Sequence, residues 1–238
     1  MPSNRPLPDD VELLVIGSGA GGLTAALTAM LDGMTVCVLE HTPWIGGTSA
    51  RSSGSVWIPD NPYMHAMGMT NDRAQAETYL AALVGERGDA AMWRRFLDAG
   101  PQMIADLRDR ADIGYTAYPA HPDYRQDKPG AAPGGRPLEP LPFDGRTLGA
   151  NFARVAWPLP ELMVFGKMMV TRGEAMELLR ADRSAKALWL AVRMVGRYLM
   201  DRLSHARGTR LVLGNALVAR LLKRLVDGGV AVATEAKT

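Results

Sequence analysis

Three glycines near the start of the chain have the spacing of a phosphate-binding turn. Gly17, Gly19 and Gly22 follow an apolar run that ends at Ile16, and a single carboxylate, Glu40, comes further on. In such a turn the first glycine permits a sharp bend, the second lets a phosphate approach the backbone, and the third lets a helix pack close to the strand. The helix then directs its free N–H groups and its positive dipole end at the phosphate.

Glu40 indicates the kind of nucleotide. A carboxylate at the end of a second strand can accept hydrogen bonds from both ribose hydroxyls of an adenosine, and it would repel a 2′-phosphate. The pattern therefore predicts a dinucleotide such as NAD or FAD and argues against NADP.

The elements that must position these residues are predicted on both sides of the turn. A strand is expected at 11–16, a helix from about 20 to 32 that ends at Gly33, and a second strand at 34–40. Ala26 is small enough to keep the helix near the sheet. A lone glycine pattern occurs by chance, but this full context favours a nucleotide-binding unit over an ordinary glycine-rich turn.

The remainder of the chain is predicted to be mostly helical, with one long loop. Helices are expected over 71–85, 89–100, 101–111 and 184–206. Asn71 is a plausible N-cap, and Gly100–Pro101 predicts a break between two helices. A short strand at 113–118 precedes a loop, 119–149, that contains seven prolines. Residues 209–234 are predicted as strand, helix and strand.

Composition excludes several classes of protein. The 238 residues are 47% hydrophobic and carry a net charge of only +2, so a polyanion partner such as nucleic acid is not expected. The one cysteine, Cys37, rules out an intramolecular disulfide and has the apolar neighbours of a core residue. The histidines lack metal-ligand spacing, so no metal site is expected.

The sequence shows neither the pattern of a signal peptide nor that of a membrane-spanning helix. Residues 1–10 contain no apolar run and are predicted to be a short disordered lead. The most apolar later stretch, 161–170, is too short to span a bilayer and contains Lys167. We therefore expect a cytoplasmic protein without an integral membrane segment.

The residues after Glu40, "HTPWIGGTSARSSGSVWIPDN", favour FAD over NAD. The Gly46–Gly47 pair followed by Thr48 and Ser49 recurs in flavoproteins, where the backbone lies along the pyrophosphate and the hydroxyls can donate to phosphate oxygens. An NAD-binding unit more often passes directly into another helix.

This segment resembles the FAD-binding domain of the fumarate reductase and succinate dehydrogenase flavoprotein superfamily. Within it, "GGTSARSSGSVWIPDN" is most similar to 3-ketosteroid 1-dehydrogenases and their relatives, in which a Ser-Gly-Gly run lines the flavin. This chain has Ser53 and Gly54 but Ser55 where a second glycine is usual. "HPDYRQDKPGAAPGGRPLEPLPFDGRTLG" and "RGTRLVLGNALVARLLKRLVDGG" resemble two further stretches of that subfamily.

The resemblance implies an α/β fold: a Rossmann-like FAD-binding domain with a parallel sheet, plus helical and loop segments that begin a substrate-covering region. Family members are considerably longer, so the chain looks like an N-terminal portion. We expect an incomplete FAD-binding domain over 11–238, with a dinucleotide unit at 11–62, an insertion at about 70–207 and a return to the sheet at 208–238.

The resemblance also implies the site. The residues expected to bind FAD are Gly17, Ser18, Gly19, Ala20, Gly21, Gly22, Glu40, His41, Gly46, Gly47, Thr48, Ser49, Ser53, Gly54 and Ser55. Trp57 is expected to line the substrate. The family's two main catalytic tyrosines come from later segments and have no counterpart here. Tyr124, and after it Tyr118, matches a tyrosine that assists the proton acceptor; the alternative, that Tyr124 only packs the proline-rich loop, stays open.

Three functional hypotheses follow. The first is an FAD-dependent oxidoreductase that dehydrogenates a bulky 3-keto, steroid-like substrate, by proton abstraction beside the carbonyl and hydride transfer to flavin N5. Its partners would be an apolar small molecule and an electron acceptor. The second is a fumarate reductase-like enzyme acting on a small dicarboxylate. The third is a truncated FAD-binding fragment without catalysis, because the isolated chain lacks the later segments.

Overall fold

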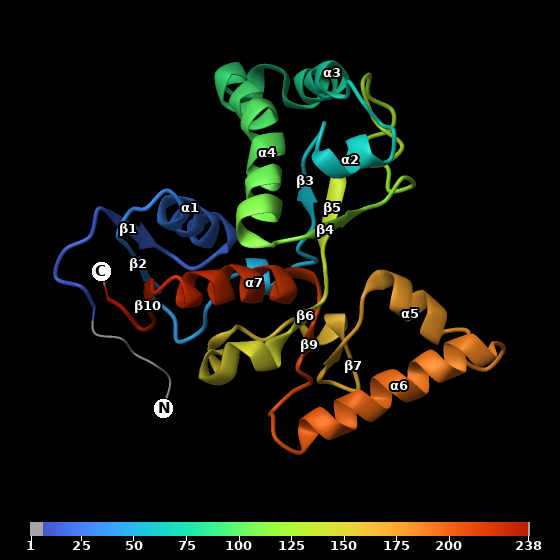
Figure 1. Ribbon diagram of the computed structural model, residues 1–238. Coiled ribbons are helices and arrows are strands. Elements are labelled where there is room, and N and C mark those ends of the chain that lie inside the picture. Colours follow the sequence, from blue (N-terminus) through green and yellow to red (C-terminus); the bar gives the residue numbers. More distant parts are fainter. Residues whose placement is uncertain (1–6, 238) are drawn as a thin grey trace. The chain divides into compact units, whose positions relative to one another are not determined.

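The computed structural model describes residues 7–237, and its chain divides into two compact units (Figure 1). The first unit contains the residues up to Gly54 and those from Pro142 onward, and the second contains Ser55–Leu141. Residues 1–6 of the predicted disordered lead lie outside the described residues. Residues 7–10 form no helix or strand.

The first unit is built on a parallel sheet in the order β1-β2-β10, with β1 (Leu13–Ile16), β2 (Val36–Leu39) and β10 (Ala231–Ala233). Helix α1 (Ala20–Leu31) packs on β1 and β2, and α7 (Leu213–Asp227) packs against α1. The strand–turn–helix–strand order, the parallel sheet and the α/β fold are confirmed.

The core of this sheet consists of side chains that the sequence pattern marked as apolar. Val38 lies between Val15 and Val232 in register, and all three are buried. Cys37 is also buried, as predicted, and burial raises the pKa of its thiol. Parallel sheets are usually covered on both faces, yet Leu14 and Ile16 on β1 are 50% and 69% exposed.

The rest of the first unit consists of short strands, two helices and 3-10 turns. Its antiparallel pairs are β6 (Phe143–Asp144) with β9 (Arg210–Leu211), and β7 (Met163–Val164) with β8 (Met168–Met169). The 3-10 turns are η1 (Ser49–Arg51), η3 (Gly145–Arg154) and η4 (Pro160–Leu162). Helix α5 (Arg172–Leu178) begins with a capping box between Thr171 and Glu174. Helix α6 (Ala185–Arg202) begins where the helix 184–206 was predicted to begin, and Ser184 is its N-cap.

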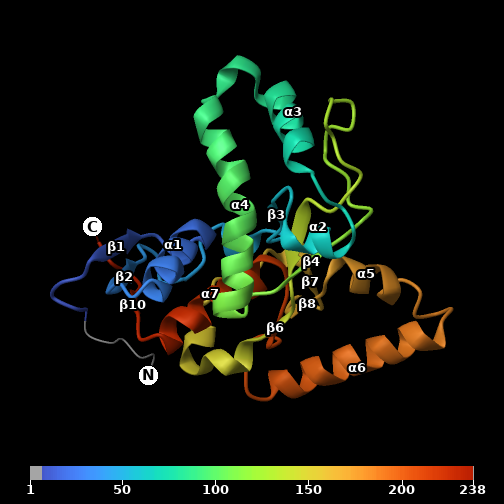
Figure 2. The same ribbon diagram turned by 45° about the horizontal axis from the view of Figure 1, so that its top comes forward.

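The second unit combines helices with an antiparallel sheet. Its α-helices are α2 (Pro62–Ala66), α3 (Arg73–Val84) and α4 (Ala90–Ala111), and the 3-10 turn η2 (Gly85–Arg87) follows α3. Figure 2 shows α3 and α4 running side by side. The sheet order is β3-β5-β4, with β3 (Val56–Trp57), β5 (Pro137–Pro140) and β4 (Tyr115–Ala117).

The predicted break at Gly100–Pro101 is wrong, because α4 continues through Pro101. A proline inside a helix removes one backbone hydrogen bond. Here buried residues recur at helical spacing on both sides of it, at Leu97, Gly100, Ile104, Leu107 and Ala111. Tertiary packing of this face therefore holds the helix together through the proline.

Three smaller expectations also differ from the structure. Strands β5 and β6 lie within the predicted loop 119–149, and α5 was not predicted. Asn71 is not the cap of α3: it has a left-handed φ of 61°, and the helix begins after Asp72. Asp72 forms no side-chain cap because its carboxylate binds Arg136 instead.

Within residues 7–237, no helix is long and apolar enough to cross a membrane. The same described residues contain no group of three or more His, Cys, Asp or Glu side chains that could hold a metal ion.

Candidate functional site

The glycines of the β1–α1 turn and of the first turn of α1 differ in what surrounds them. A Cβ added to Gly22 would lie 2.1 Å from the carbonyl oxygen of Gly17, so the helix can approach the turn this closely only with glycine at that position. A Cβ at Gly19 would meet only Ser49 Oγ, at 3.7 Å, and one at Gly21 would meet nothing within 4 Å. Open space therefore lies beside Gly19 and Gly21, where a ligand can approach the backbone.

The first turn of α1 has donors to offer to such a ligand. Gly19 is the N-cap residue, and no side chain caps the helix from this position. Ala20 N–H donates to Ser49 Oγ at 3.0 Å. Among the described residues, the N–H groups of Gly21 and Gly22 find no acceptor outside the helix. Free N–H groups at a helix N-terminus suit an anion such as a phosphate.

Glu40 directly follows β2, and its carboxylate binds both the β1–α1 turn and the loop that follows β2. Oε2 accepts hydrogen bonds from the N–H and the hydroxyl of Ser18, and Oε1 accepts from the N–H and hydroxyl of Thr42 at 2.8 and 2.9 Å. Burial alone would raise the pKa of Glu40, but these hydrogen bonds outweigh it and hold the pKa below its ordinary value. The carboxylate is therefore ionised at neutral pH.

These four bonds bear on the predicted role of Glu40 toward ribose. A carboxylate offers about four lone-pair positions, so a ribose hydroxyl must displace one of the present donors. The Thr42 hydroxyl is the exchangeable donor, because Thr42 is exposed and its Oγ1 also lies 2.8 Å from the carbonyl oxygen of Trp44. Ser18, by contrast, is fully buried.

The second glycine pair lies against the first turn. Gly46 N–H donates to Ser18 Oγ at 2.9 Å, so Ser18 links Glu40 to this loop. Gly46 is buried at φ 115°, and a Cβ there would lie 2.8 Å from Val218 Cγ1. Gly47 has φ 49°, is exposed, and has open space around its Cα. The structure thus brings the two predicted loops together and leaves Gly47 accessible.

Two residues at the start of α7 pack against residues 49–54, and the sequence analysis did not predict them as part of the site. A Cβ at Gly214 would lie 1.9 Å from the carbonyl oxygen of Ser49, and one at Gly54 would lie 2.5 Å from the Gly214 nitrogen. Asn215 Nδ2 donates to the carbonyl oxygen of Ala50 at 2.6 Å. The one sequence feature that could have indicated this role is the Gly-Asn pair at the start of a predicted helix.

Arg207 holds this support in place. Its guanidinium donates to Asn215 Oδ1 at 3.0 Å and to the carbonyl oxygen of Val155 at 3.2 Å. It also lies over the rings of Phe152 and Trp157. Arg207 is almost fully buried, and this burial lowers the pKa of its guanidinium to about 10.

The other predicted cofactor residues are mostly exposed. His41, Thr48 and Ser53 lie on the surface of the first unit, and Ser55 is exposed at the start of the second. Their predicted contacts with FAD stay predictions.

The second unit contains an apolar cavity of about 300 Å³, whose lining includes the predicted residues Trp57 and Tyr124 together with Tyr79. Trp57 is held firmly: its Nε1–H donates to Asp123 Oδ1 at 2.6 Å, and its ring stacks on Phe96 with centroids 6.3 Å apart.

The two candidate tyrosines differ in their surroundings. Tyr124 is 98% exposed, and its hydroxyl makes no hydrogen bond to any described residue. Tyr118 is 39% exposed, and its ring meets that of His121 edge-on with centroids 6.5 Å apart. Of the two, only Tyr124 lines the cavity.

Comparison with known proteins decides the family. A family model described as an FAD-binding domain matches residues 12–237. The chain belongs to this FAD-binding domain family. The predicted resemblance is thereby confirmed, and family membership implies FAD as the cofactor.

Relatives of this FAD-binding domain include dehydrogenases of oxo compounds. The chain is 32% identical over 228 residues to the 3-oxosteroid 1-dehydrogenase of Mycobacterium tuberculosis. The aligned region covers 94% of this chain and 39% of the relative. The chain is 33% identical over 227 residues to the 4-oxocyclohex-2-ene-1-carboxylate 5-dehydrogenase of Sinomonas cyclohexanicum, over 95% of this chain and 38% of the relative. The chain thus spans about two fifths of the length of these curated relatives.

A solved structure agrees with this FAD-binding domain in fold. The crystal structure of 3-ketosteroid delta1-dehydrogenase from Sterolibacterium denitrificans, in complex with 1,4-androstadiene-3,17-dione, superposes with a TM-score of 0.84 at 33% identity. The match covers 94% of this chain and 40% of that one.

The geometry of this FAD-binding domain fits the dinucleotide part of FAD. The space beside Gly19 and Gly47 admits phosphate to the backbone, and the first turn of α1 offers N–H donors. The ionised Glu40 lies at the place where the family's ribose is expected. These residues would hold the adenosine and pyrophosphate.

Glu40→Gln tests the carboxylate in both roles. At neutral pH the variant should lose about 1–3 kcal/mol of unfolding free energy, because an amide cannot accept all four hydrogen bonds. Since the folded-state pKa of Glu40 is lowered, its contribution is present above the ordinary pKa of about 4.3 and is lost as pH falls through the folded-state value. FAD should bind about tenfold more weakly.

The measurements are urea unfolding at a series of pH values from 7 down to about 3, and FAD titration at pH 7. Glu86→Gln is the matched control, because Glu86 is exposed and its carboxylate has no hydrogen-bond partner within residues 7–237. A stability difference that stays constant from pH 7 down to about pH 3 would contradict the assigned role of the ionised carboxylate.

Proposed function

We propose that this chain is the FAD-binding part of a dehydrogenase that acts on a bulky, apolar substrate with a ring ketone. The observation that carries the proposal is the cavity of the second unit, whose walls are apolar and which has the free hydroxyl of Tyr124 at its edge. The names of the relatives in mycobacteria and in Sinomonas support it, since each describes the dehydrogenation of an oxo compound.

The residues of the chain would divide the work as follows. FAD, when bound, accepts the hydride. The carbonyl of the substrate acidifies the neighbouring C–H, and Tyr124 would support the group that takes this proton by donating a hydrogen bond. Trp57, fixed by Asp123 and Phe96, offers a rigid apolar wall that orients the substrate.

A small dicarboxylate suits this cavity less well. Recognition of two carboxylates calls for arginine or lysine donors, and the lining residues include neither. The remaining alternative is an FAD-binding fragment without catalysis. The assay below includes this alternative because the chain spans only about two fifths of the length of its relatives.

Two substitutions test the roles proposed for Tyr124 and Trp57. Tyr124→Phe should lower turnover by up to about a hundredfold without changing FAD affinity, because the hydroxyl assists proton transfer only. Trp57→Ala should raise KM through lost apolar contact worth about 1–3 kcal/mol. Tyr118→Phe, which removes a hydroxyl from a residue that does not line the cavity, should have little effect.

The assay uses the FAD-loaded chain, and any longer product that its gene encodes, with an artificial electron acceptor. The panel contains 3-ketosteroids, oxocyclohexanecarboxylates, fumarate and succinate. Activity confined to fumarate or succinate would assign the protein to the dicarboxylate class. Absence of turnover in every form, with FAD bound, would support the fragment.

A further inference from the structure

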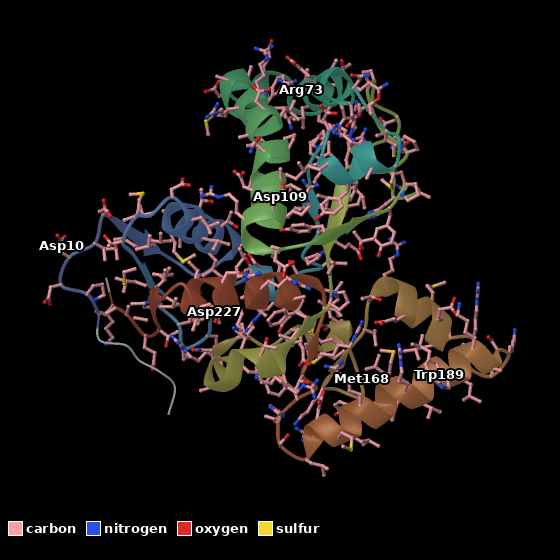
Figure 3. The ribbon with its side chains drawn as sticks, viewed as in Figure 1. Asp10, Arg73, Asp109, Met168, Trp189 and Asp227 are labelled. Carbon is pink, nitrogen blue, oxygen red and sulfur yellow. The ribbon has the colours of Figure 1, made fainter. Side chains whose placement is uncertain are left out.

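The first unit contains a cavity that none of the candidate site residues lines. It has a volume of about 310 Å³ and lies between β8, α5, α6 and β9. Its walls include three methionines and three arginines: Met168, Met169, Met194, Arg193, Arg197 and Arg210. Figure 3 shows Met168 beside α6, the helix that supplies Met194 and two of the arginines.

The guanidinium groups of this cavity have more donors than the protein satisfies. Arg197 Nε and Nη2 and Arg210 Nη1 are shielded from solvent, yet they make no hydrogen bond. Arg197 Nη2 lies 3.4 Å from Asp144 Oδ2, which provides an ion pair without hydrogen-bond geometry. Buried donors without acceptors are unfavourable, so this cluster is incomplete as a purely structural feature.

The nearby carboxylates are already engaged by other donors. Glu174 binds Arg210 Nη2 at 2.6 Å through Oε1 and the backbone N–H of Thr171 through Oε2. Asp201 Oδ2 accepts from both the N–H and the hydroxyl of Thr209. None of the described carboxylates forms a hydrogen bond with the three guanidinium nitrogens named above.

Arg193 adds uncompensated positive charge at the rim. Its guanidinium lies over the ring of Trp189, 4.8 Å from the centroid, and it has no carboxylate partner among the described residues. Below the arginines, Met168, Met169 and Met194 are all less than a tenth exposed and form an apolar floor. A polar, cationic rim above an apolar floor matches a ligand with an anionic head and a short apolar body.

We propose that this cavity binds a small organic carboxylate. The carboxylate would accept hydrogen bonds from Arg197 and Arg210, and a short hydrocarbon body would lie on the methionine floor. Methionine side chains adapt to apolar ligands of differing shape, so the hydrocarbon body is the less selective part of the ligand.

Calorimetric titration of the full chain without FAD tests this site separately from the proposed function. Hexanoate should bind at least tenfold more tightly than acetate, and hexylamine should not bind. Arg197→Gln should weaken hexanoate binding at least tenfold. Arg183→Gln removes the same charge from an exposed side chain outside the cavity and should bind as the parent does.

Folding of each variant is checked by circular dichroism. Because Arg210→Gln would also break the ion pair with Glu174, Arg193→Gln serves as the second variant: it is exposed and has no carboxylate partner to lose. It should weaken hexanoate binding by a smaller factor. Equal affinity for hexanoate and acetate, or hexanoate affinity unchanged in a folded Arg197→Gln protein, would overturn the proposal.

Discussion

Gly19→Val should abolish FAD binding and leave the fold intact, whereas Gly22→Ala should damage both. Gly19 has extended backbone angles that any residue adopts, and a Cβ there meets only Ser49 Oγ at 3.7 Å. A valine side chain would therefore fill the space that the phosphate needs. Loss of two hydrogen bonds to a charged group costs about 3 kcal/mol or more, a hundredfold or more in Kd.

Gly22 has a different role in the same turn. A Cβ at this position would lie 2.1 Å from the carbonyl oxygen of Gly17 and 3.3 Å from Val15 Cγ1. The backbone oxygen cannot yield as a flexible side chain can, so α1 must move away from β1. We expect a lower melting temperature together with lost FAD binding.

Both variants are compared with the parent by FAD titration and thermal melting. Gly173→Val is the control, because a Cβ there meets nothing within 4 Å and its φ is not left-handed. Full FAD affinity in Gly19→Val would remove this turn from the site. An unchanged melting temperature in Gly22→Ala would mean that the helix does not lie as close to the turn as described.

Arg136→Met should cause the largest loss of stability of any single substitution considered for the second unit. The fully buried guanidinium donates to both oxygens of Asp72 at 2.8 Å, to Asp123 Oδ2 at 2.6 Å and to the carbonyl oxygen of Gly130. Removing it leaves two buried carboxylates without a counter-charge, which costs about 3–5 kcal/mol. Burial alone would lower the pKa of Arg136, but its bonds to Asp72 and Asp123 raise it.

Urea unfolding measures this loss, and Arg125→Met is the control. Arg125 pairs with Asp127 on the surface, where the ion pair is screened by solvent, so its removal should change stability little. Adding Asp72→Asn and Asp123→Asn to Arg136→Met should restore part of the lost stability, since the buried charges are then gone. An Arg136→Met protein as stable as the parent would contradict the buried ion-pair network.

Local features of the sequence determined the nucleotide-binding unit. Buried-strand periodicity, the Gly17–Gly22 spacing and Gly33 act over a few residues, so β1, α1 and β2 could be predicted before any contact was known. The pattern also predicted a strand, a helix and a strand over 209–234, and the family resemblance implied that this segment returns to the sheet, as β10 does. These motifs left NAD and FAD open, and the family and its cofactor were predicted from the resemblance of the residues that follow Glu40 to known flavoproteins.

Only the tertiary structure decided how the distant parts of the site meet. The bond from Asn215 to Ala50 joins residues 165 positions apart, and that from Arg136 to Asp72 joins residues 64 apart. No periodicity connects such pairs, so the partner of Asp72 could not be read from a helix-cap pattern. The continuity of α4 through Pro101 likewise depends on a buried face, because packing against neighbouring elements outweighs the local preference of one residue.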